Sequence, residues 1–109
     1  MELTKEENLA LQSFKNNLRE KMGNSFLELK LFGSKARGDA RADSDIDVLV
    51  VLKSEDWHDS DLVYEIATDI LIDNGISISP KVISERTFKI QKKRGVSFIE
   101  NVIRDGVTV

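Results

Sequence analysis

The sequence contains no cysteine, and it has only one proline and one histidine. Without cysteine the chain can form neither disulfides nor thiolate metal sites, and a cytoplasmic location is the expected default. The lone histidine, His58, has no second His or Cys to complete a metal site and is interpreted as a surface residue. The lone proline, Pro80, cannot donate to a β-ladder, so the strand that contains it is expected at a sheet edge or at a bulge.

Long apolar runs are also missing. The longest, such as residues 48–52, have the length of a strand and fall far short of a membrane-spanning helix. Residues 1–7 lack the basic-then-apolar layout of a signal peptide, so neither export nor a membrane location is expected. A chain of 109 residues is long enough for one core, and we expect a single domain over residues 1–109.

Charge of one sign is scarce in two segments. Residues 55–73 contain seven acidic side chains and no Lys or Arg, whereas residues 81–95 contain six basic side chains and one acid, Glu85. The net charge of −3 argues against strong general binding to nucleic acid. The two segments are interpreted either as solvated helix faces or as a basic surface that holds a polyanion or an acidic partner.

The hydrophobic pattern predicts alternating helices and strands. Thr4 and Glu7 form a capping-box pattern that should begin a helix ending near Met22. Strands are expected at residues 26–32, 46–52 and 76–83, and helices at residues 62–74, 84–95 and 96–105. The loop 33–44 is too short for a helical crossover, so the first two strands should be antiparallel and the third can run parallel to the second. This predicts an α/β (α+β) fold, a small mixed sheet with helices packed on it.

Two carboxylates stand at the entrance of the apolar strand 46–52. Asp45 and Asp47 are two residues apart, so in a strand both side chains point to one face. Two carboxylates this close repel each other unless a cation lies between them, and Mg²⁺ is the natural choice because it prefers oxygen ligands and phosphate. Alternatively, Asp45 is a turn residue and Asp47 faces solvent.

A glycine and a serine end the neighbouring strand on the same side. Gly33 allows close approach of the backbone to a ligand, and Ser34 with exposed backbone N–H groups can bind an anion. Lys35, Arg37 and Arg41 follow in the same loop, with Arg37 best placed to contact phosphate. The segment is not a Walker A loop, because no Gly-Lys-Ser/Thr follows a four-residue spacer.

Gly33-Ser34, ten intervening residues and Asp45-x-Asp47 resemble the signature of the polymerase-beta-like nucleotidyltransferase superfamily, and the fuller run Phe-Gly-Ser-Lys-Ala-Arg-Gly is similar to its minimal nucleotidyltransferase (MNT) branch. The resemblance covers nearly the whole chain. It implies that Gly33 and Ser34 contact a nucleoside triphosphate and that Asp45 and Asp47 bind Mg²⁺ as the catalytic pair, and Arg37 is added to the nucleotide-binding candidates because of its place in the loop and its charge. The family usually has a third carboxylate on a later strand, but residues 76–83 offer Ser77 and Ser79 and no acid.

Two functions are therefore expected as alternatives. In the first, the protein is a magnesium-dependent nucleotidyltransferase that transfers NMP, AMP from ATP, to a hydroxyl on a partner protein. The resemblance implies that this partner can be a HEPN-type toxin in a toxin-antitoxin pair. In the second, a catalytically weak or inactive domain of the same fold acts as an antitoxin or regulatory subunit by binding its partner. A nucleic-acid-binding domain that uses the basic segment 81–94 ranks last.

Overall fold

The computed structural model describes residues 3–41 and 44–109 and contains a mixed β-sheet with strand order β3-β2-β1-β4. The strands are β1 (Phe26–Phe32), β2 (Ile46–Leu52), β3 (Ile78–Ser84) and the short β4 (Val107–Thr108). As predicted, β1 and β2 are antiparallel, β2 and β3 are parallel, and the strand with Pro80 lies at an edge. The antiparallel pairing of β4 with β1 was not predicted.

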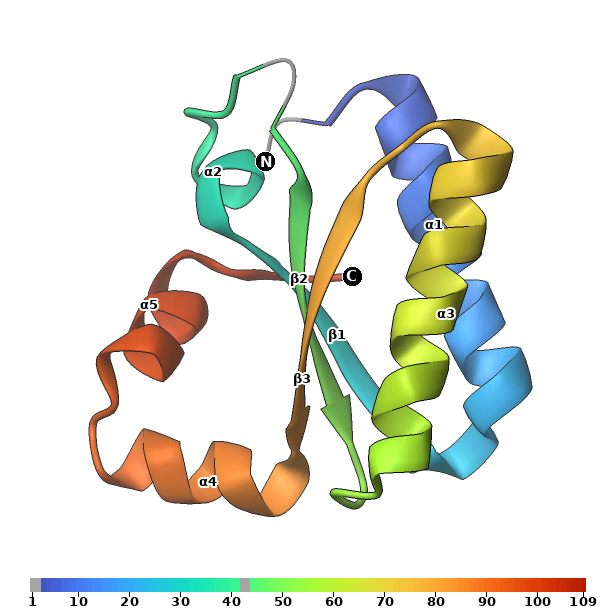
Figure 1. The fold of residues 1–109 in the computed structure, drawn as a ribbon. Helices are drawn as coiled ribbons and strands as arrows, with labels where there is room; N and C mark the ends of the chain where they lie inside the picture. The colour runs from blue at the N-terminus through green and yellow to red at the C-terminus, as the bar shows by residue number, and fades with distance from the viewer. Residues whose placement is uncertain (1–2, 42–43) are drawn as a thin grey trace.

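Helices cover the two faces of the sheet unequally (Figure 1). The long helices α1 (Lys5–Met22) and α3 (Trp57–Asn74) pack on one face, and the shorter α4 (Glu85–Lys93) and α5 (Ser97–Asp105) lie on the other. A short helix α2 (Gly33–Arg37) follows the end of β1, and a 3-10 turn η1 (Gly23–Ser25) precedes that strand. The expected α/β fold is therefore confirmed. None of the helices in the described residues is long and apolar enough to cross a bilayer.

Helix α1 begins where its capping box predicts. The Glu7 backbone N–H donates to Oγ1 of Thr4, and the Thr4 backbone N–H donates to Oε1 of Glu7, each over 3.0 Å. These two bonds satisfy N–H groups that have no acceptor within the helix. Apolar side chains at three- and four-residue spacing are buried against the sheet: Ala10, Leu11, Phe14, Leu18 and Met22.

Strand β2 is the centre of the core, as its apolar sequence predicts. Ile46, Val48, Val50 and Leu52 belong to the large cluster under α1 and α3, whereas Leu49 and Val51 form a smaller cluster with Val102 of α5. Helix α4 contributes no fully buried residue. The face that carries α4 and α5 is therefore less completely covered, and Asp47 points to this face because it alternates with Ile46 and Val48.

Two boundaries differ from the sequence prediction. Residues 33–37 form helix α2 instead of an open turn, because Lys35 and Ala36 find buried positions there. Helix α3 begins at Trp57, within the segment 54–60 that was predicted as a polar connection. The Asp56 side chain accepts from the His58 backbone N–H over 2.9 Å and caps the helix, which explains the earlier start.

Candidate functional site

The ends of β1 and β2 bring the two halves of the motif together. Phe32 of β1 pairs with Asp47 of β2, so Gly33, the next residue, begins directly beside the Asp47 carboxylate. Asp45 is exposed and precedes β2, and Asp47 is half-buried. The predicted proximity of the Gly-Ser turn and the second aspartate is thus present in the structure.

Gly33 fits against Asp47 because it has no side chain. Its φ is +74°, a left-handed conformation that L-residues with a Cβ adopt at a cost. A Cβ built there would lie 2.5 Å from Oδ2 of Asp47, which is too close for any real contact. Two separate reasons therefore require a glycine at this position: the left-handed backbone and the space that the Asp47 carboxylate occupies.

The electrostatics of the pair reflect this crowding. Burial and the neighbouring charge of Asp45 raise the pKa of Asp47, and the charge of Arg37 only partly offsets this rise. The carboxylate pair of Asp45 and Asp47 is thus poor in positive charge within the protein itself. A cation that binds between them would relieve the repulsion.

Arg37 ends α2 on the side of the two aspartates. Its side chain is 47% exposed, and its Nε lies 3.3 Å from Oδ2 of Asp39. An exposed ion pair of this kind contributes little to stability, so Arg37 can leave Asp39 and bind another anion at little cost. Arg37 also lines the hollow that Asp105 of α5 lines, where the hydrogen bond and charge of Arg104 lower the pKa of Asp105 and the charge of Arg37 adds to this effect. Arg37 is therefore available to an anion at this end of the sheet.

Lys35, unlike Arg37, is not available to bind an anion. Its Nζ lies 2.8 Å from Oε2 of Glu7, and the two side chains are 5% and 10% exposed. Although burial raises the pKa of Glu7, the hydrogen bond and charge of Lys35 together with the bonds from Thr4 outweigh it, and the pKa lies below its usual value. The ion pair ties α2, and with it the Gly33-Ser34 turn, to the start of α1. The role of Lys35 is to position this turn.

Strand β3 provides no acid beside the two aspartates. Ser79 is the register partner of Asp47, and Lys81 is the partner of Leu49, so both β3 side chains face the same side as Asp47. Both residues are exposed. Within residues 3–41 and 44–109 no group of three or more His, Cys, Asp or Glu side chains is arranged to hold a metal ion. Ser79 and Lys81 are thus the β3 side chains nearest in register to the carboxylate pair.

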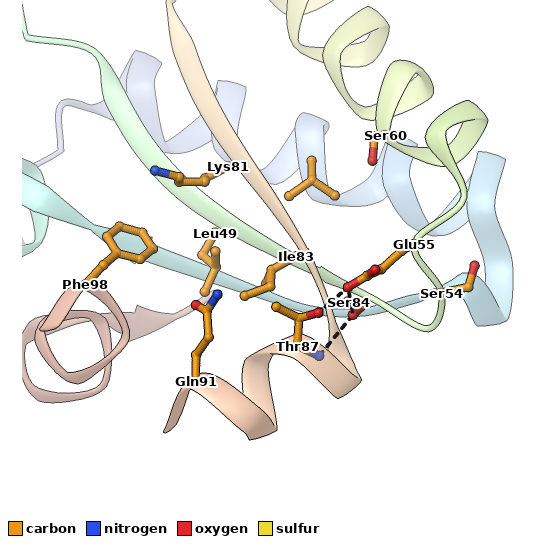
Figure 2. A pocket seen from close by; sticks show the side chains of 11 residues that line it. Leu49, Ser54, Glu55, Ser60, Lys81, Ile83, Ser84, Thr87, Gln91 and Phe98 are labelled. Atoms are coloured by element: carbon orange, nitrogen blue, oxygen red, sulfur yellow. Dashed lines mark hydrogen bonds between the residues drawn. The ribbon is translucent and has the colours of Figure 1, made fainter. Parts of the chain in front are cut away.

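Phe98 of α5 lies where three hollows meet. One, of about 350 Å³, opens over Asp47, Ser79 and Lys81; a second, of about 210 Å³, lies beside Gly33 and Arg37; and Phe98 lines both. Its ring meets that of Phe32 edge-on, with centroids 5.3 Å apart, and Nζ of Lys81 lies 4.7 Å from its centroid. The third hollow is the groove in Figure 2, which continues from Lys81 and Phe98 towards α4.

The donor set fits a magnesium ion better than a softer metal. Asp45 and Asp47 offer carboxylate oxygens only, and an ion bound by one or two carboxylates takes its other ligands from water and substrate phosphate. The raised pKa of Asp47 indicates a site that favours a positive charge. The chain thus supplies the carboxylate half of such a site and leaves the rest to a ligand.

The structure brings together Gly33, Arg37 and Asp47, which sequence patterns proposed as site residues, and it adds Lys81 and Phe98, which those patterns did not propose. Lys81 could have been found, because in parallel strands the residues that alternate with Ser79 share its face. Phe98 had no such signal. Its position depends on how α5 packs on Phe32, and a helix sequence alone does not contain that information.

The fold and this site define a class of protein. The sequence profile of a family described as "Nucleotidyltransferase domain" matches residues 11–103. A Methanocaldococcus jannaschii protein named "putative protein adenylyltransferase" is 38% identical over 100 residues, which cover 92% of this chain and 94% of that protein. The chain belongs to the nucleotidyltransferase domain family, and the resemblance drawn from its motifs is confirmed. A second protein of that name and organism is 31% identical over 77% of this chain and 59% of its own length.

Solved structures share the fold. A structure described as a "putative minimal nucleotidyltransferase" aligns over 100% of this chain and 97% of its own, with a TM-score of 0.55 and 23% identity. A chain of the toxin-antitoxin complex MntA-HpeT aligns over 91% of this chain and 70% of its own, with a TM-score of 0.56 and 19% identity. A toxin-antitoxin structure with AMP-PNP aligns over 96% and 72%, with a TM-score of 0.56 and 18% identity. At these identities the comparison concerns the fold alone.

Proposed function

We propose that the protein is a magnesium-dependent nucleotidyltransferase that transfers AMP from ATP to a hydroxyl group on a partner protein. The observation that carries the proposal is the contact between Gly33 and Asp47, which sets a phosphate-binding turn against a carboxylate pair. Of the relatives, the M. jannaschii protein with the name of a protein adenylyltransferase supports a protein acceptor.

Each residue of the site has a separate task in this proposal. The backbone of Gly33 and Ser34 and the guanidinium of Arg37 bind and orient the triphosphate. Asp45 and Asp47 hold Mg²⁺, which when bound supplies charge stabilisation to the phosphate oxygens. The acceptor oxygen attacks the α-phosphorus, the bond to the β-phosphate bridging oxygen breaks, and pyrophosphate leaves with that electron pair. The acceptor proton passes to water, because β3 presents Ser79 where a carboxylate could have accepted it.

A second candidate function rests on Ser79. If a third carboxylate is needed to deprotonate the acceptor, its absence costs up to about 10²–10⁴-fold in rate, the range typical of general-base catalysis. The domain would then bind its partner, with or without nucleotide, and act by occupying it. Retention of Asp45 and Asp47 argues for the enzyme, because a crowded carboxylate pair lowers stability when it binds no cation.

We further propose that the partner belongs to a toxin-antitoxin pair, with a HEPN-type toxin as the acceptor and this chain as the antitoxin. The fold shared with a chain of the MntA-HpeT complex supports this proposal. ATP as the nucleotide is supported by the related structure described with AMP-PNP.

The decisive experiment uses α-labelled ATP, Mg²⁺ and the protein encoded beside this chain or purified with it, and compares the wild type with Asp47→Asn. We expect label on the partner with the wild type only, and no label when Mg²⁺ is removed with EDTA. Equal neutralisation of the partner by both proteins, without label, would contradict transfer and favour the binding function.

A further inference from the structure

Helix α4 presents two different sides. Thr87 and Gln91 point into the groove between α4 and β3 (Figure 2), while Phe88 packs against the small cluster under α5. Lys89 and Lys92 lie on another side of the helix, because at about 100° per residue they are about 180° and 120° around the axis from the midpoint of Thr87 and Gln91. Nζ of Lys89 lies 3.5 Å from Oε1 of Glu85 on that side.

A stripe on α4 adjoins the groove. Arg86, Ile90 and Arg94 follow one another at spacings of four residues along the helix and its C-cap, next to the side of Thr87 and Gln91. All three are exposed, Ile90 to 39%. The stripe thus has one cation on each side of an apolar side chain. This is the composition of a surface that binds an acidic chain with an apolar anchor.

The charge at the Glu55 end of the groove is already balanced. Glu55 accepts hydrogen bonds from the hydroxyls of Thr87 and Ser84, the latter over 2.7 Å (Figure 2). These bonds, together with the charge of Arg86, hold the pKa of Glu55 below its usual value. Glu55 therefore fixes the start of α4 to the end of β3.

The inner end of the groove leads to the candidate site. Lys81 and Phe98 line both this groove and the hollow over Asp47. Among the described residues Lys81 forms no ion pair, and its Nζ lies over the Phe98 ring. A chain bound along the α4 stripe would pass Lys81 before it reached Asp47.

We infer that this stripe, with Lys81 at its inner end, is the surface that recognises the acceptor, and that the acceptor hydroxyl lies in an acidic segment of the partner protein. The inference rests on the proposed transfer to a protein. Carboxylates of that segment contact Arg86 and Arg94, and an apolar side chain packs on Ile90. The acceptor hydroxyl then points past Lys81 towards the carboxylate pair.

An acidic protein fits this surface better than a nucleic acid does. The stripe is short and has an apolar centre, whereas phosphate binding favours cations throughout. Elsewhere the chain is acidic, with a net charge of −3, and α3 exposes Asp61, Glu65, Asp69 and Asp73. A long polyanion that wrapped beyond α4 would meet this repulsion, and a short acidic segment would not.

Two double variants of equal charge separate a specific surface from a general charge effect. Arg86→Gln with Arg94→Gln removes both cations from the stripe, and Lys89→Gln with Lys92→Gln removes two cations from another side of the same helix. The probe is a labelled Glu-rich peptide with one leucine and one serine, and its binding is measured by fluorescence anisotropy without ATP. The comparison ligands are the same peptide with Gln for every Glu, and a single-stranded RNA of equal charge.

We expect the Glu-rich peptide to bind the wild type, and its affinity to fall about 5–30-fold in the stripe variant, as for the loss of two partly exposed ion pairs. The Lys89/Lys92 variant should stay within about twofold of the wild type. Equal weakening in both variants, equal binding of the Gln peptide, or tighter binding of the RNA would overturn the inference.

The same variants distinguish this inference from the proposed function. Binding of a fluorescent ATP analogue should be unchanged in the stripe variant, because Arg86 and Arg94 lie outside the nucleotide site. If the peptide binds as expected but α-labelled ATP labels neither its serine nor the partner protein, the surface that binds an acidic segment stands and the transfer activity is contradicted.

Discussion

A side-chain carbon on Gly33 would lie 2.5 Å from Oδ2 of Asp47, so the motif that begins β2 requires the glycine that ends β1. The two residues are far apart in the sequence and adjacent in the sheet. The family signature is thus one packed contact in three dimensions. A change on either side should affect both the phosphate-binding turn and the carboxylate pair.

The first prediction compares Gly33→Ala with Gly75→Ala. Both glycines have left-handed backbones, with φ of +74° and +70°, so both variants lose about 1–2 kcal/mol of free energy of unfolding from the backbone alone. At Gly75, the C-cap of α3, nothing lies within 4 Å of an added Cβ. Gly33→Ala should therefore be the less stable in urea denaturation, and it alone should lose binding of a fluorescent ATP analogue. Equal stability and normal nucleotide binding in both variants would disprove the role of the contact.

The second prediction is that Asp47→Asn stabilises the protein in the absence of metal and lowers its transfer activity. Burial and Asp45 raise the pKa of Asp47 in the folded state, so the charged carboxylate opposes folding, and this cost appears as the pH rises through that pKa. At pH 7 without metal, the variant should have a higher free energy of unfolding than the wild type.

With Mg²⁺ and ATP the order should reverse. The wild type gains stability by ligand binding, whereas the variant lacks one of two carboxylate ligands. Transfer should fall about 100-fold or more, because metal stabilisation of charge is worth several kcal/mol. Thermal unfolding with and without Mg²⁺ measures the stability, and label transfer from α-labelled ATP measures the rate. Asp69→Asn on the exposed face of α3 is the control. A variant that Mg²⁺ stabilises as much as the wild type would remove Asp47 from the metal site.

Sequence patterns predicted most of this fold because its elements have strong local signals. The capping box at Thr4 and Glu7 fixed the start of α1, and the apolar run of β2 required a central strand. Residues 33–37 were harder, since the helix there depends on the ion pair between Lys35 and a residue in another helix. The two residues of β4 pair with β1 only because α5 returns the chain to that edge, and such a contact has no local signal.

The third prediction concerns the buried pair of Glu7 and Lys35. Removal of either partner leaves a buried charge without compensation, which costs about 3–5 kcal/mol. Replacement of both, Glu7→Leu with Lys35→Met, should cost much less than the sum of the single changes. A double-mutant cycle by urea denaturation measures the coupling. Purely additive effects would mean that the ion pair does not hold α2 in place.

The pH dependence of stability also tests the pair of Glu7 and Lys35, because the pKa of Glu7 is lowered whereas that of Asp47 is raised. The pKa of Glu7 is lowered in the folded state, so its contribution is complete above the unfolded-state value near 4.5 and is lost as the pH falls through the folded-state pKa. We expect the wild type to lose stability below that value, and Glu7→Gln to be less stable at pH 7 with a flatter acid profile. An unchanged acid profile in Glu7→Gln would assign the acid sensitivity to other carboxylates.

The last prediction adds the carboxylate that β3 lacks. Ser79 is exposed and is the register partner of Asp47 in neighbouring parallel strands, whose backbones lie about 4.8 Å apart. In Ser79→Asp a third carboxylate would therefore stand beside the pair, close enough to bind metal or to accept the acceptor's proton. Without metal, the added charge should lower the free energy of unfolding.

With Mg²⁺, Ser79→Asp should bind the ion more tightly and raise the rate of transfer by about tenfold or more, part of the range that general bases supply. The Ser79→Asn side chain has nearly the shape of the Asp side chain but no charge, so it should change neither the Mg²⁺ affinity nor the transfer rate. The measurements are Mg²⁺-dependent thermal stabilisation and label transfer from α-labelled ATP. Tighter metal binding without faster transfer would show that proton removal does not limit the reaction. Equal behaviour of the Asp and Asn variants would mean that a side chain at position 79 does not reach the carboxylate pair, and that β3 contributes nothing to the metal site.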